Sequence, residues 1–302
     1  MADWVGKAAF LLRPVHARLF ERLKASTKLF ADETTAPALD PGRGRNTTGQ
    51  LFAYARDERP WGGADPPGVT YLYAPDRKAE QPIRHLQGFA GVLQVDGFAS
   101  YKTQAERNAM SLAFCWSYVR RKFYDLAQGG PAPIVTEALV RIATLYQVEA
   151  DIRGCSAEER CAARQARGRH IVAALEPWLK GKLGLVSQKS KLAEATHYAL
   201  SRWAGLSRFL DDGRVEIDSN VVERAIRPIA LNRKNAFFTG SDVGAEHWAV
   251  IASLVETCKQ NGVDPQAYFG DVITRIVAGH PRSQIGDLLP WACAPQQLKA
   301  VA

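Results

Sequence analysis

Apolar positions near the start of the chain recur at helical spacing, with Lys and Arg between them. This pattern predicts an amphipathic helix over residues 4–25, which Pro14 should kink or split. Three aromatic and apolar runs then follow, at residues 28–32, 50–56 and 69–74, as is typical of β-strands. The Pro/Gly-rich segments that join them are predicted to be loops, so the three runs indicate an antiparallel meander.

A helix and a fourth strand are predicted after the meander, at residues 79–89 and 92–96. A helical crossover returns the fourth strand parallel to the first, with a right-handed connection strongly favoured. Asp32 and Asp96 are then expected to end adjacent parallel strands. Neighbouring strands lie about 4.8 Å apart, so two carboxylates at like ends can share one ion.

The second half of the chain has almost entirely helical periodicity. A short helix at 101–108 and a fifth strand at 112–116 precede it, and helices are predicted throughout 131–214, starting with 134–152 and 156–183. A further helix carries the apolar positions Val221, Val222, Ala225, Ile226 and Ile229, and Pro228 should bend it. Helices at 248–260 and 265–277 follow.

Composition indicates an ordinary globular protein with an excess of positive charge. With 302 residues and 46% hydrophobic content, the chain can bury one large or two modest cores. A net charge of +8 favours polyanionic partners, nucleic acid before anionic membrane. Five cysteines without a CxxC pair indicate a reducing cytoplasm, and no targeting or membrane-spanning segment is predicted.

Much of the positive charge is concentrated in the helical stretch. Residues 153–191 contain nine Lys or Arg and three Glu, and Arg160, Arg164 and Arg167 share one predicted helical face. Two interpretations remain open for this face. It is either a solvated basic surface or a surface that contacts phosphates.

Three acids suit a two-magnesium phosphodiester site: Asp32 and Asp96 at strand ends, and Glu223 on a helix. Hard divalent ions prefer carboxylate oxygen, and two such ions can stabilise both oxygens of an in-line displacement. Among 31 acids, however, this spacing is a weak signal. Glu33 could replace Asp32, although strand alternation points the two to opposite faces. Asp96 could be a plain turn residue, and Glu223 could form a capping box with Asn220.

Longer motifs make the signal specific. The stretches STKLFADETTAPALDPGRGRNTTGQ, LQGFAGVLQVDGFASY and IDSNVVERAIRPIALNRKNAFFTGSDVGAE resemble, in register, the core of the IS66-type transposases of bacterial insertion sequences. The likeness continues through CWSYVRRKFYDL, the helical stretch and the C-terminal NGVDPQAYF and LLPW segments.

The resemblance implies an α/β, ribonuclease-H-like mixed five-stranded sheet with flanking helices and an all-helical insertion. It implies Asp32, Asp96 and Glu223 as carboxylates that bind Mg²⁺, with Mn²⁺ as a substitute. The implied chemistry is nicking at transposon ends by water, followed by attack of the freed 3′-hydroxyl on target DNA. Its partners would be double-stranded DNA, companion proteins of the same element and further copies of the chain, in the bacterial cytoplasm at the nucleoid.

Basic residues near these acids are candidate phosphate contacts. Arg120, Arg121 and Lys122 follow the fifth strand, and Arg224, Arg227, Arg233 and Lys234 follow Glu223. A surface ion pair between Glu223 and Arg227 is the alternative. Trp116 and Trp203 are expected in the core rather than stacked on bases.

The chain departs from the family pattern at three places. Tyr118 stands where relatives often have a histidine, and Ser219 precedes Asn220 where two asparagines are common. Full-length relatives also carry a long N-terminal portion ahead of the position of Trp4, so we expect the parts that recognise transposon ends to be missing here.

The predicted organisation is an N-terminal helical segment (1–27), a first core part (28–130), a basic helical insertion (131–215) and a second core part (216–302). The predicted function is a DDE transposase core. A catalytically silent DNA-binding remnant is the main alternative, and a two-carboxylate glycoside hydrolase is a third that the basic insertion does not favour.

Overall fold

A five-stranded mixed sheet forms the centre of the protein. The computed structural model describes residues 2–40, 45–97, 101, 105, 110–130, 132–235 and 239–293. The strands are β1 (Lys28–Asp40), β2 (Arg45–Arg56), β3 (Gly68–Ala74), β4 (Val92–Val95) and β5 (Ser111–Phe114). Their order is β3-β2-β1-β4-β5, with β1, β2 and β3 antiparallel and β4 and β5 parallel to β1. The predicted meander and the parallel fourth strand are therefore confirmed. The predicted fifth strand is also present, at residues 111–114 rather than 112–116, and it runs parallel to β4.

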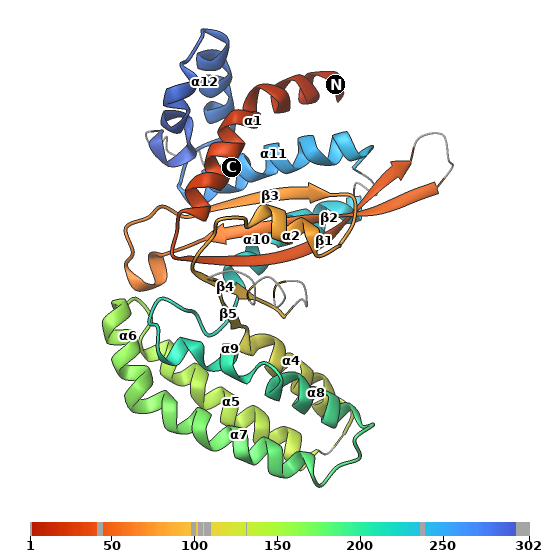
Figure 1. The fold of residues 1–302 in the computed structure, drawn as a ribbon, viewed down its shortest axis with the longest axis vertical. Coiled ribbons are helices and arrows are strands. Elements are labelled where there is room, and N and C mark those ends of the chain that lie inside the picture. Colours follow the sequence, from red (N-terminus) through yellow and green to blue (C-terminus); the bar gives the residue numbers. More distant parts are fainter. Residues whose placement is uncertain are drawn as a thin grey trace, which may run out of the picture.

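Helices cover both faces and one edge of this sheet (Figure 1). Those around the sheet are α1 (Ala2–Lys24), α2 (Glu80–His85), α10 (Asn220–Asn235), α11 (Asp242–Gln260) and α12 (Pro265–Val277). Those gathered beside β5 are α4 (Trp116–Ala127), α5 (Pro133–Asp151), α6 (Ala157–Ala163), α7 (Arg169–Leu183), α8 (Lys191–Leu200) and α9 (Trp203–Ser207). A π-helical turn, Arg164–Gly168, joins α6 to α7.

Side-chain alternation along β1 supplies two different cores. Leu29 and Ala31 pack with α1 and α11, whereas Phe30 packs on the opposite face against apolar side chains of α10. Because successive strand residues point to opposite faces, Asp32 follows Phe30 toward α10 and Glu33 follows Ala31 away from it. This geometry separates the two neighbouring acids, as strand alternation predicts.

A third core holds the helices beside β5 together. Apolar side chains of α4, α5, α7 and α8 pack there with Ala113 of β5. Trp116 is fully buried and its indole N–H donates to the carbonyl of Leu206 at 2.8 Å, while its ring meets Trp203 edge to face at 5.7 Å. Both tryptophans are therefore core residues, as expected.

The structure corrects the predicted loop between the first two strands. Residues 37–40 and 45–49 are strand, not loop, and Pro37 pairs with Thr48 across a long hairpin. Proline can stand in a strand where its missing N–H is not needed by the partner. As a result, Asp32 lies within β1 rather than at its end.

Several element limits also differ from the prediction. The helix expected at 79–89 is only α2, and the helix expected to begin at 248 begins at Asp242, where Ser241 caps it. The helix at 265–277 has the predicted limits, whereas the one expected at 101–108 lies largely outside the described residues.

Candidate active site

Asp32 and Asp96 occupy equivalent heights on two adjacent parallel strands. The last paired position between β1 and β4 joins Phe30 to Gln94, and each aspartate lies two residues beyond it. The Asp32 carboxylate accepts a hydrogen bond from the backbone N–H of Glu33 at 2.8 Å. The juxtaposition of the two acids that the crossover predicts is therefore present, although Asp32 lies inside its strand and Asp96 directly follows the end of β4.

Side chains of the helical region hold the turn that carries Asp96. The Tyr198 hydroxyl donates to the backbone carbonyl of Asp96 at 2.5 Å, and Arg202 donates to that of Gly97 at 3.2 Å. Gly97 has φ = +112°, and a side chain there would collide with the Arg202 guanidinium. This turn therefore requires glycine.

Glu223 lies in the first turn of α10, on the helix that packs against β1. The Ser219 hydroxyl donates to its carboxylate at 3.3 Å. The amide of Asn220 instead donates to Asp218 at 2.6 Å, and Asn220 is already helical. Among the contacts of the described residues there is no capping box between Asn220 and Glu223, so the Glu223 carboxylate is not used to cap the helix.

A buried glutamine joins the strand of Asp96 to the segment before Glu223. The side chain of Gln94 is fully buried, and its amide donates to the carbonyls of Glu216 and Asp218 at 2.7 and 2.9 Å. Its own oxygen accepts the N–H of Glu216 at 3.3 Å. Gln94 therefore fixes the chain that enters α10 against β4. The sequence pattern did not single out Gln94, although a polar residue between Leu93 and Val95 of an apolar strand was a usable signal.

Neighbouring carboxylates act electrostatically on Asp32. Burial is the main cause that raises the pKa of Asp32, to about 7. Among the neighbouring charges, Asp96 contributes most to this rise, and Glu33 and Glu223 contribute less. The pKa of the Tyr118 hydroxyl is also raised, by burial first and then by Asp32, Glu223 and Asp96. Tyr118 thus lies within electrostatic reach of all three candidate acids.

Glu33 has a different environment from Asp32. Its carboxylate forms an ion pair with Arg77, and although burial raises its pKa, this hydrogen-bonded guanidinium opposes the shift. Asp32 has no ion pair among the described residues. The acid without a neutralising cation is the better candidate to hold a metal.

The donor set fits a hard divalent cation in its chemistry, since all three groups are carboxylates that repel one another. In the described part of the chain, no three His, Cys, Asp or Glu side chains are close enough to form a complete metal cage. Mg²⁺ retains several waters and uses one or two carboxylates together with substrate phosphate oxygens, so it does not need such a cage.

The basic candidates fall into two groups. Arg120 and Arg121 line a cavity with Glu223, and Arg224 and Arg227 are exposed on α10. Within the described residues no ion pair joins Glu223 to Arg227, so the structure does not contain the surface ion pair that was the alternative to phosphate binding by Arg227. Lys122 instead lies 3.5 Å from Glu194. The side chains of Arg233 and Lys234 lie outside the described residues.

Two of the basic candidates in the helical region are corrected by the structure. Arg160 and Arg164 are 3% and 0% exposed and are paired with Glu216 and Glu149, so they are not part of an outer basic face. Both arginines point inward because the side of the helix that carries them packs against other segments of the protein. Arg167 is half exposed and lies 2.5 Å from Asp151.

A mixed sheet of this order, with acids on β1, after β4 and on a later helix, is the ribonuclease-H-like fold of DDE transposases. Residues 1–247 match the family described as "Transposase IS66 family", and residues 253–291 match the "IS66 C-terminal element". The chain belongs to the IS66 transposase family.

Three relatives, all from Sinorhizobium fredii (strain NBRC 101917 / NGR234), extend this result. The uncharacterized protein y4qI is 46% identical over 99% of this chain and 57% of its own length. The uncharacterized proteins y4jD and y4hP are 42% and 38% identical, over 60% and 55% of their lengths. The chain thus spans little more than half of each relative. No solved structure matches it.

Among the described residues, none of the helices is both long and apolar enough to span a membrane. All five cysteines are free thiols, in line with the expected lack of a disulfide framework.

Proposed function

We propose that this chain carries the site for metal-dependent DNA cleavage and strand transfer, with Asp32, Asp96 and Glu223 as its metal-binding carboxylates. The observation that supports this most is the raised pKa of Asp32 on β1, to which the charges of Asp96, after β4, and of Glu223, on α10, both contribute. A titratable group whose pKa is strongly perturbed is more common at functional sites than elsewhere.

Each acid has a defined task in this proposal. With a pKa of about 7, Asp32 is ionised above neutral pH and becomes a full ligand there. Gln94 fixes the segment that leads to Glu223, and Tyr198 fixes the turn that carries Asp96. Bound Mg²⁺ would supply Lewis-acid activation of the nucleophile and neutralise charge on the phosphate.

The reaction would proceed in two displacements at phosphorus. In the first, water forms a new P–O bond and the bond to the 3′-oxygen breaks, which leaves a 3′-hydroxyl. In the second, that hydroxyl attacks a phosphodiester of target DNA and displaces its 3′-oxygen. Arg120 and Arg121 line a cavity with Glu223, and Arg224 and Arg227 are exposed on the same helix as Glu223; all four would bind flanking phosphates.

We further propose that the substrate is double-stranded DNA and that the protein acts as a homo-oligomer with companion proteins, at the nucleoid in the cytoplasm. In this proposal the chain is organised as an N-terminal helical segment (1–27), a first core part (28–130), a helical insertion (131–215) and a second core part (216–302).

The direct test is nicking of supercoiled plasmid in Mg²⁺ or Mn²⁺ by the purified chain. Asp32→Asn, Asp96→Asn and Glu223→Gln should each abolish nicking while the protein remains folded by circular dichroism. Glu33→Gln is the matched control, because it changes the neighbouring acid on the opposite face and should leave nicking intact.

Two outcomes would count against the proposal. Loss of nicking in Glu33→Gln but not in Asp32→Asn would exchange the two acids. A folded parent that binds DNA in a salt-sensitive way but never nicks it would favour the catalytically silent remnant, for which the exchange of a family histidine for Tyr118 is the motivating observation.

A further inference from the structure

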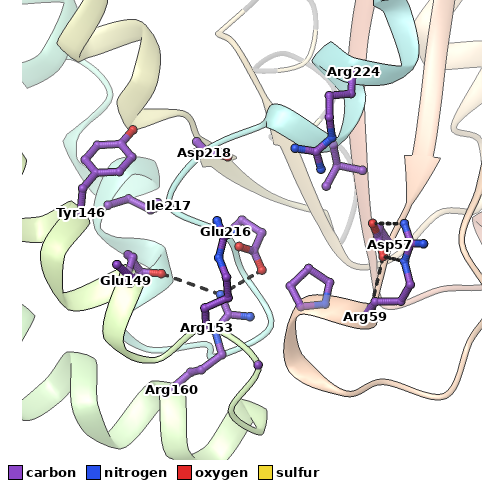
Figure 2. Close-up of a pocket in the computed structure, with 14 residues that line it drawn as sticks. Asp57, Arg59, Tyr146, Glu149, Arg153, Arg160, Glu216, Ile217, Asp218 and Arg224 are labelled. Atoms are coloured by element: carbon purple, nitrogen blue, oxygen red, sulfur yellow. Dashed lines mark hydrogen bonds and ion pairs between the residues drawn. The ribbon is translucent and has the colours of Figure 1, made fainter.

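Two cavities meet between the helical region and the start of α10. The first, of about 740 Å³, lies between the segment after β2, the end of α5 and the residues that lead into α10 (Figure 2). The second, of about 840 Å³, lies between α4, α5 and Glu223. Tyr146, Ala150 and Asp218 line both. We call the combined depression the insertion groove.

Most carboxylates of the first cavity are already neutralised. Asp57 accepts two side-chain hydrogen bonds from Arg59, both at 2.8 Å. Glu149 is paired with Arg164, and Glu216 lies 2.9 Å from Arg160. The pairs of this cavity therefore leave little net negative charge in its wall.

Two arginines that line this cavity have side chains without a partner among the described residues. Arg153 and Arg224 are exposed, line the first cavity, and have no side-chain hydrogen bond or ion pair among the described residues. The remaining acid, Asp218, accepts hydrogen bonds from the backbone and side chain of Asn220. Most carboxylates of the cavity wall are already paired, so two free guanidinium groups favour an anionic ligand. Guanidinium groups bind phosphate oxygens well.

Aromatic surface accompanies this charge. Tyr146 lies where the two cavities join, and Tyr124, which is 50% exposed, lines the second. A positively charged groove with aromatic side chains is the arrangement that binds single-stranded nucleic acid, since every base can stack on an aromatic ring.

The groove is continuous with the candidate active site. Glu223 lines the second cavity and the next residue, Arg224, lines the first. We propose that the insertion groove binds a single DNA strand beside the cleaved phosphate, with Arg153 and Arg224 on its phosphates and Tyr124 and Tyr146 against its bases. The identity of the ligand as DNA rests on the proposed function.

Binding of labelled oligonucleotides, measured by fluorescence anisotropy in EDTA with the Asp32→Asn protein, tests this without any cleavage. The probes are a single strand, a blunt duplex and a duplex with a single-stranded extension. Arg153→Gln and Arg224→Gln should each weaken binding of the two probes that contain single strand by about three- to tenfold. Each should also reduce the slope of log affinity against log salt by about 0.7, the value for one lost contact with a single-strand phosphate.

Arg275→Gln is the matched control, because it removes the same charge from α12, where Arg275 pairs with Asp271. It should leave all three affinities nearly unchanged. Tyr124→Leu alters an exposed side chain and should weaken single-strand binding at least about fivefold, as expected for one lost stack.

The inference is overturned if the folded parent does not bind single strands, or if Arg153→Gln and Arg224→Gln behave like Arg275→Gln. Equal losses for duplex and single strand would also overturn it. Because binding is measured without cleavage, a failure of the nicking assay would leave these results interpretable on their own.

Discussion

The sheet and the helical region differ in whether their buried charges are paired. Around Asp32 three carboxylates lie within electrostatic reach, and Asp32 has no ion pair in the described part of the chain. Around Glu149 each buried charge has a partner: Arg164 meets it with two hydrogen bonds, at 2.6 and 2.7 Å, and also donates to the carbonyls of Phe209 and Asp212. Paired charges of this kind hold segments together, whereas unpaired charges of one sign are typical of ligand-binding sites.

The largest effect should come from breaking the compensated pair. Arg164→Met leaves Glu149 buried without its main partner, and we expect a loss of about 3–5 kcal/mol in the free energy of unfolding, measured by urea denaturation. Arg167→Met is the control, since it removes an exposed arginine from its pair with Asp151 and should cost less than about 1 kcal/mol. Similar losses in both variants would contradict the contrast.

Neutralising the uncompensated cluster should have the opposite sign. The pKa of Asp32 is raised in the folded state, to about 7, so its ionisation destabilises the fold as pH rises from about 4 to 7. Asp32→Asn should therefore stabilise the protein by roughly 2–4 kcal/mol at pH 8 and by much less at pH 4. Denaturation at both pH values measures this.

Mg²⁺ sharpens the same comparison. It should raise the stability of the parent at pH 8 and that of Asp32→Asn far less, because binding to the folded state alone is stabilising. A stability of Asp32→Asn equal to or below that of the parent at pH 8 would show that Asp32 carries no electrostatic strain.

The Gln94 linkage should have an intermediate effect. Gln94→Met removes the donors to two part-buried carbonyls and should cost about 1–3 kcal/mol of stability. It should also raise the Mg²⁺ concentration for half-maximal nicking, because Glu223 loses its fixed position relative to Asp96. Asn261→Leu is the control, as its amide also donates to two carbonyls, both at 2.8 Å, on a different element.

Asn261→Leu should lower stability comparably and leave the Mg²⁺ requirement unchanged. An identical shift of the requirement in both variants would reduce Gln94 to a general structural role.

The smallest effect should come from Tyr118→His. An imidazole facing Asp32, Asp96 and Glu223 should have its folded-state pKa raised above about 6.5, which adds stability at low pH that is lost as pH rises through that pKa. We expect a gain of about 0.5–1 kcal/mol at pH 6 relative to pH 8, compared with the parent. A change of the opposite sign would show that burial outweighs the three carboxylates.

Much of the fold could be predicted because it depends on local periodicity. The alternation around Asp32, the helical spacing before Pro14 and the Asp264–Pro265 start of α12 are all local patterns, and the structure has each of them. The hairpin could not be predicted, because Pro37 and the glycines suggest a loop while pairing with β2 holds residues 37–40 in a strand. Partners distant in sequence decide such cases.

The sequence by itself determined the family, through its motifs, and the order of the strands, through periods of two and 3.6 residues. Only the tertiary structure decided which arginines are free. Arg160 and Arg153 have the same side chain and are seven residues apart, yet one is buried against Glu216 and the other faces a cavity. The reason is physical: the state of a charge depends on its neighbours in space and on its access to water, and the chain brings these neighbours from distant elements.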